Sequence, residues 1–95
     1  MKKYEAMFII KPDLSEEERK ALFVQISDSI TKNNGSILQS SIWQERKKLF
    51  FVIKKYREGT YYLVNFTIPG EAIAKIRHSY TLNESILRTL ISATD

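Results

Sequence analysis

The chain has 95 residues, enough for one hydrophobic core and therefore for a single domain over residues 1–95. Hydrophobic residues make up 43% of the chain and charged residues 27%, which is typical of a folded globular protein and excludes a disordered one. The sequence contains no cysteine, so disulfides and cysteine-based metal or catalytic sites are excluded. The net charge of +4 favours a polyanionic partner without requiring one.

The N-terminal segment predicts a central strand over residues 3–10. Both of its faces are apolar near the end, because Phe8 and Ile10 alternate with Met7 and Ile9. This apolar run is too short for a signal peptide or a membrane span. We therefore expect a cytoplasmic protein that contacts no membrane.

A helix is predicted next. Ser15 followed by Glu18 is a capping-box pattern, and an apolar stripe at helical spacing comes after it. The stripe consists of Leu22, Ile26 and Ile30. We expect Gly35 to end the helix by adopting a left-handed backbone conformation.

The rest of the chain predicts a hairpin, a second helix and a last strand. Residues 36–53 indicate a long edge strand interrupted by a bulge at 44–48, and a loop at 56–59 joins it to a strand over 60–68. A helix over 71–80 and a strand over 86–91 follow. Right-handed crossovers in a βαββαβ order predict an α+β fold, the ferredoxin-like plait. It is a four-stranded antiparallel sheet with both helices on one face.

Several segments resemble the bacterial ribosomal S-six family, in matching order over residues 2–92. These segments are residues 3–5, 11–15, 46–54, 59–62 and 82–88. The most specific is the basic cluster Arg46-Lys47-Lys48, followed by an apolar stretch and Lys54. Glu45 departs from the family, which usually has a glycine there, and this leaves the geometry of the bulge open.

The resemblance implies a structural, non-enzymatic constituent of the small ribosomal subunit that acts in translation on the cytoplasmic ribosome. Its implied partners are the central domain of small-subunit rRNA and ribosomal protein S-eighteen. No cofactor and no small-molecule substrate are implied.

Basic residues are the expected RNA contacts, because each phosphate they neutralise releases counterions. The residues that we expect to contact rRNA are Lys2, Lys3, Tyr4, Arg46, Lys47, Lys48, Lys54 and Arg88. Lysines on an edge strand could equally protect it from aggregation, and Tyr4 could be a core residue. Arg88 is expected on the same face as Ile86 and Leu90, where a phosphate or a structural carboxylate would have to accommodate it.

The helix-free sheet face is the expected protein-binding surface. Met7, Tyr61 and Leu63 would form an apolar patch there, which indicates a binding site for S-eighteen unless the long hairpin covers it. Trp43 is interpreted as a packing residue rather than a platform for base stacking.

Nothing in the sequence predicts an enzyme. His78 is the only histidine and has no partners at metal-ligand spacing, so we expect no metal site. Three alternatives share the fold: an RNA-recognition-motif-like single-strand binder, a dimeric regulatory plait and an acylphosphatase-like enzyme. The first lacks its aromatic signature on the third strand, and the last lacks an arginine in the loop at residues 11–13.

Overall fold

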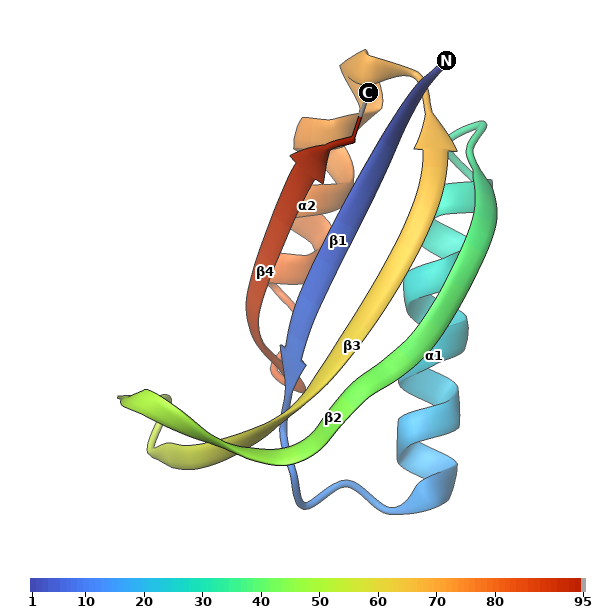
Figure 1. Cartoon of the computed structure of the whole chain (residues 1–95). Helices are drawn as coiled ribbons and strands as arrows, with labels where there is room; N and C mark the ends of the chain where they lie inside the picture. Colours follow the sequence, from blue (N-terminus) through green and yellow to red (C-terminus); the bar gives the residue numbers. More distant parts are fainter. Residues whose placement is uncertain (95) are drawn as a thin grey trace.

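The computed structural model describes residues 1–94 and confirms the predicted order of elements (Figure 1). The elements are β1 (Lys2–Ile10), α1 (Glu16–Thr31), β2 (Ser36–Ile53), β3 (Tyr56–Ile68), a 3-10 turn η1 (Gly70–Ala72), α2 (Ile73–Thr81) and β4 (Ile86–Ala93). The strands form one antiparallel sheet in the order β2-β3-β1-β4, and both helices pack on the same face. This is the predicted ferredoxin-like plait, with β1 central and β2 at an edge.

The hydrophobic core lies between the sheet and the two helices. Phe8 and Phe66 are fully buried there, and the predicted helical stripe of Leu22, Ile26 and Ile30 packs against them. The Tyr80 hydroxyl donates to the Ile26 carbonyl over 3.0 Å. Burial raises the pKa of Tyr80 to about 12, because the charged phenolate is poorly solvated inside the core.

The start of α1 is as predicted, but its end is not. Ser15 and Glu18 form both hydrogen bonds of the capping box. The bond that the Ser15 backbone N–H donates to the Glu18 carboxylate is the main cause that lowers the pKa of Glu18. At the other end the left-handed residue is Asn34, with φ 68°, and not Gly35. Gly35 is needed for space instead, since a Cβ there would lie 2.6 Å from the carbonyl oxygen of Thr67.

The predicted position of the hairpin loop is wrong. The turn lies at Lys54 and Lys55, whose φ angles are 49° and 73°, and β3 begins immediately afterwards at Tyr56. Two central residues with positive φ define a type I′ turn, in which asparagine and glycine are the usual residues. The glycine that suggested a loop, Gly59, lies inside β3. It allows close packing there, because a Cβ would stand 2.4 Å from Cγ2 of Ile9.

The end of the β2–β3 hairpin curls across one end of the helix-free sheet face (Figure 1). Leu49 of the hairpin is buried against Ile9 and Leu87 in a second, smaller apolar cluster. The predicted bulge in β2 is confirmed by a register shift between Gln44 and Lys47. Arg46 adopts the positive φ in this bulge, at 47°. Glu45 therefore does not need the backbone conformation that only glycine adopts easily.

Candidate nucleic-acid interface

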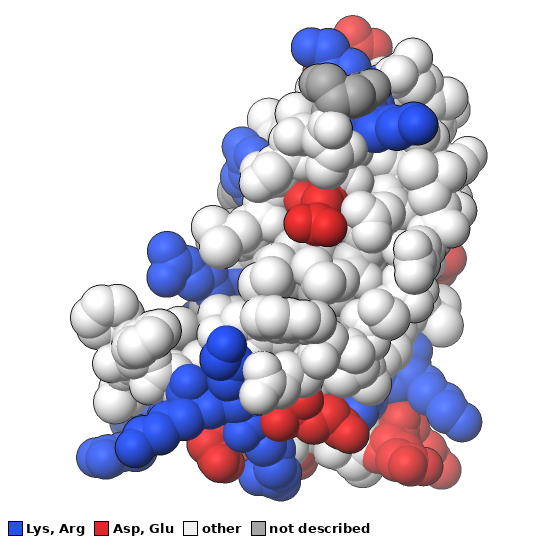
Figure 2. Space-filling model, in the orientation of Figure 1, with Lys and Arg blue, Asp and Glu red and all other residues white. Residues whose placement is uncertain are grey.

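Positive charge is concentrated on the hairpin. Residues 46–57 contain Arg46, Lys47, Lys48, Lys54, Lys55 and Arg57 and no acidic residue. Figure 2 shows basic side chains gathered over the curled end of the hairpin, at the lower left, while the middle of the sheet face is mostly uncharged. Arg46 pairs with Glu58 at 3.4 Å, but both side chains are exposed. An exposed pair of this kind holds its guanidinium weakly and leaves it available to a phosphate.

Lys47 is held by two aromatic rings. Its ammonium nitrogen lies 4.9 Å from the ring centre of Trp43 and 5.3 Å from that of Tyr61. The two rings meet edge-on, with their centres 5.6 Å apart. These cation–π contacts give Lys47 and Trp43 a packing role. An RNA contact by Lys47 stays a prediction, and it would have to be made from this restrained position.

Arg88 lies near the start of β4, and the side chain of Lys54 reaches this region from the hairpin turn. The ammonium group of Lys54 donates to the Ile86 carbonyl over 3.3 Å. Arg88 stands opposite Ile9 on the helix-free face, whereas Ile86 stands opposite Ile10 and is buried in the core. The expectation that Arg88 and Ile86 share a face is therefore wrong. A bulge at this point adds one residue to β4 and reverses the alternation.

Lys2, Lys3 and Tyr4 lie at the opposite end of the sheet. Lys2 pairs with Ile68, whereas the other end of β1 meets β3 at Thr60, next to the basic hairpin. Eight residue steps along a strand separate the two ends by about 27 Å. Tyr4 is half-buried, and its ring stacks on Phe66 with the ring centres 5.8 Å apart. The structure thus divides the predicted RNA contacts into two groups.

An apolar row crosses the helix-free face. Met7 is the cross-strand partner of Leu63 on one side and of Leu90 on the other, and Leu90 is 51% exposed. Tyr61 lies closer to the hairpin and packs against the cluster that the hairpin covers. Cover by the hairpin is therefore confirmed at this end of the face, and a protein partner for the rest of it stays a prediction. The sequence analysis missed Leu90, although its alternation with Arg88 on the last strand could have indicated it.

The hairpin also exposes aromatic side chains that the sequence analysis did not single out. Phe50 is 98% exposed, Phe51 is 75% exposed, and Val52 beside them is 58% exposed. The signal was available, since consecutive apolar residues on a strand cannot all face one core.

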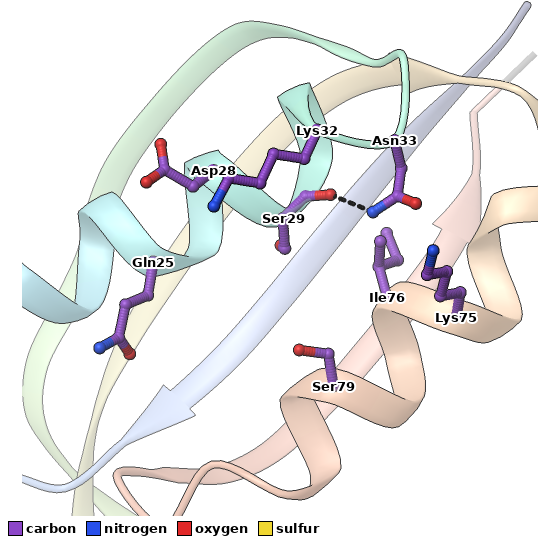
Figure 3. A pocket seen from close by; sticks show the side chains of 8 residues that line it. All are labelled: Gln25, Asp28, Ser29, Lys32, Asn33, Lys75, Ile76 and Ser79. Atoms are coloured by element: carbon purple, nitrogen blue, oxygen red, sulfur yellow. Dashed lines mark hydrogen bonds between the residues drawn. The ribbon is translucent and has the colours of Figure 1, made fainter.

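Metal-binding groups are not brought together in the described part of the chain. Within residues 1–94, no cluster of three acidic or histidine side chains could hold a metal ion. A cleft of about 430 Å³ lies between α1 and α2, and Figure 3 shows the side chains that line it. The bond drawn there runs from the Asn33 amide to the Ser29 carbonyl, over 2.6 Å. It ties the end of α1 to its own preceding turn.

None of the helices in the described residues is long and apolar enough to cross a membrane. The fold and these surfaces define a small α+β protein, a ferredoxin-like plait with a basic hairpin at one end and an apolar row on its open face.

Comparison with known proteins identifies the family. The family model described as ribosomal protein S6 matches residues 3–93. A small ribosomal subunit protein bS6 from Thermoanaerobacter pseudethanolicus is 40% identical over 95 residues, covering 100% of this chain and 99% of the relative. Its Campylobacter concisus counterpart is 40% identical over 90 residues, covering 95% of this chain and 64% of the relative.

The fold agrees with a solved structure of the same family. The crystal structure of 30S ribosomal protein S6 from Thermotoga maritima matches with a TM-score of 0.88 at 29% identity, covering 98% of this chain and 87% of that one. The chain belongs to the ribosomal protein S6 family. Members of this family are structural, non-enzymatic constituents of the small ribosomal subunit, which acts in the cytoplasm.

Proposed function

We propose that the chain binds the central domain of small-subunit rRNA through its basic hairpin, together with ribosomal protein S-eighteen. The observation that carries the proposal is the acid-free run of cations from Arg46 to Arg57 at the free end of a protruding hairpin. Such a surface binds phosphates, and its affinity is steeply salt-dependent.

Exposed aromatic rings support RNA over other polyanions. Phe50 and Phe51 stand among these cations, and unpaired bases stack on exposed aromatic side chains. An RNA-recognition-motif-like function is less well supported. It needs base-stacking aromatics on the two central strands, where the helix-free face of β1 and β3 offers Tyr61, already in contact with Trp43 and Lys47.

The predicted cations lie at two opposite ends of the sheet, and we assign the main rRNA contact to the hairpin end. Arg46, Lys48 and Lys54 lie together there, whereas Lys2 and Lys3 lie about 27 Å away along β1. Lys2, Lys3 and Tyr4 then make a second rRNA contact, which a folded RNA can reach only by following the length of the sheet.

The rRNA part is tested by filter binding of a central-domain rRNA fragment at several salt concentrations, with and without S-eighteen. We expect tight binding only in the presence of S-eighteen. The double variant Arg46→Gln with Lys48→Gln should lower the slope of log affinity against log salt by about one to two. The matched control, Lys20→Gln with Lys75→Gln, removes the same charge from exposed positions on the two helices. An unchanged slope in the hairpin variant would identify these cations as edge protection only.

The protein partner is assigned to the apolar row. Met7, Leu63 and Leu90 form a continuous strip across three strands on a face with little charge, with Tyr61 at its hairpin end. Because large exposed apolar patches mark interaction sites, we place S-eighteen there.

The test replaces Leu63 with Glu and measures co-purification and joint rRNA binding with S-eighteen. We expect both to be lost while the fold is retained. Val24→Glu is the control, since Val24 is 57% exposed on α1 and lies outside the row. Sedimentation of the chain alone separates the dimeric alternative, because a self-associating sheet face would give a dimer that Leu63→Glu disrupts.

A further inference from the structure

A small pocket lies at the outer edge of β4, where this strand has no strand neighbour. Three separate elements enclose it: the second half of α2, the start of β4 and the turn of the hairpin. Its volume is about 280 Å³, and its lining residues are Arg77, Tyr80 and Thr81, residues 86–89, and Lys54. The pocket therefore exists only in the folded chain, because residues far apart in the sequence meet there.

The lining is strongly positive. Lys54, Arg77 and Arg88 each come from a different element, and no acidic residue lines the pocket. Within residues 1–94 the ion pairs are Arg19 with Glu45 and Arg46 with Glu58, so none of these three cations is neutralised by a carboxylate. Two hydroxyl side chains, Thr81 and Thr89, complete the polar part of the lining.

Lys54 lines the pocket from the hairpin turn, and a hydrogen bond to a backbone carbonyl positions its side chain. Its φ of 49° belongs to the tight turn, and its ammonium group donates to the Ile86 carbonyl over 3.3 Å. An ammonium group has three protons to donate, so this bond leaves two of them for a ligand. A positioned cation loses less conformational freedom on binding than a mobile surface lysine does.

The end of α2 opposes anion binding only weakly. A helix C-terminus carries a partial negative charge of about half an elementary charge. Three full positive charges outweigh it. The hydroxyl of Thr81 and the backbone N–H of Leu82 also donate to carbonyls of the last turn, which satisfies part of that negative end.

We propose that this pocket is a binding site for a phosphate group. Guanidinium groups match the geometry of phosphate oxygens and remain charged at every physiological pH, and the Thr89 hydroxyl supplies a further donor. The phosphate can belong to an RNA backbone or be a free phosphate ion. The first source rests on the proposed rRNA binding and adds Arg77, on the helix layer, to that contact.

The first experiment uses the same rRNA fragment and S-eighteen and compares the natural chain with Arg77→Gln and Arg88→Gln. For an RNA phosphate, each variant lowers the salt slope by about one and weakens binding about tenfold. Lys75→Gln, on the same helix but outside the pocket, leaves both unchanged. Circular dichroism of each variant checks that the fold is retained.

The second experiment titrates the free protein with inorganic phosphate and follows backbone amide signals by NMR. A free-phosphate site shifts the signals of Thr81 and Thr89 in the natural chain and not in Arg77→Gln, while the rRNA measurements stay unchanged. If neither the salt slope nor these signals respond to Arg77→Gln, the proposal is overturned. If the natural chain fails to bind rRNA altogether, the proposed function fails. The phosphate titration then still shows whether the pocket binds phosphate.

Discussion

The two faces of the central strands β1 and β3 differ in composition and in burial, because the helix-covered face is almost entirely apolar and the helix-free face only in part. On the helix side, Phe8 and Phe66 are fully buried, and Tyr80 from α2 packs edge-on against Phe8 with the ring centres 4.9 Å apart. On the other side, Met7 and Leu63 stay partly exposed, and only the end near the hairpin is covered. Alternation along a strand divides one sequence between a surface that stabilises the fold and a surface that remains partly exposed.

The largest expected effect separates the two faces directly. Phe66→Ala should lower the free energy of unfolding by about 3 to 5 kcal/mol, because it opens a cavity in a closed core. Leu63→Ala, three residues earlier on the helix-free face, should cost about 1 kcal/mol, since its side chain already meets solvent. Urea denaturation of both variants measures the difference. Equal losses would mean that the open face is a second core rather than a binding surface.

High pH should lower the free energy of unfolding through the ionisation of Tyr80, which lies on the helix-covered side of the sheet. Its folded pKa of about 12 exceeds the ordinary value of 10.0, so the unfolded chain releases this proton first as the pH rises. The stabilisation that the shifted pKa of Tyr80 adds to the free energy of unfolding is fully present below pH 10. It is lost as the pH approaches 12, and the loss amounts to about 2 to 3 kcal/mol.

Urea denaturation between pH 9 and 12 measures this loss. Tyr80→Phe is the control, since it removes the ionising group and should flatten the tyrosine part of the decline. It should also cost about 1 kcal/mol at pH 7, through the lost hydrogen bond to Ile26. An equally steep decline in Tyr80→Phe would show that other groups cause it.

The sequence predicted the layers of the fold and the composition of each face, because periodicity and capping are local. Ser15 with Glu18, the stripe of Leu22, Ile26 and Ile30, and the order of strands and helices all matched. Prediction failed at Gly35 and Gly59. These glycines are required because a side chain would collide with residues from distant strands, and local sequence preference does not reveal such a contact.

The same limit applies to the candidate site. The basic run from Arg46 could be read from the sequence, but its separation from Lys2 and Lys3 could not, because it depends on strand pairing. Arg88 shares a face with Leu90 as predicted, but not with Ile86, because the bulge in β4 between them leaves no local pattern in the sequence. The participation of Arg77 in a pocket likewise requires the packing of α2 beside β4 and the hairpin turn.

A smaller effect probes the covered end of the open face. Gly59→Ala places a Cβ 2.4 Å from Cγ2 of Ile9, so the hairpin has to shift, at a cost of about 1 to 3 kcal/mol. Adding Ile9→Ala removes the obstructing atom, and the double variant should lose less than the sum of the single losses. Gly70→Ala is the control, since its nearest contact is the Tyr4 hydroxyl at 3.4 Å. Thermal unfolding checks all four proteins, and strict additivity would refute the close contact.

The smallest expected effect on stability should come with a loss of binding. Lys54 and Lys55 occupy turn positions with positive φ that favour asparagine and glycine, so Lys54→Asn with Lys55→Gly should raise the free energy of unfolding by about 0.5 to 1 kcal/mol. The same change removes two cations from the proposed rRNA contact and should lower the salt slope. Lys54→Met with Lys55→Met separates the two effects, because it removes the charges while keeping the strained backbone. That variant should weaken rRNA binding without any gain in stability. If the asparagine–glycine turn is more stable and binds rRNA as tightly as the natural chain, the lysines have no role in binding that would explain the strained turn.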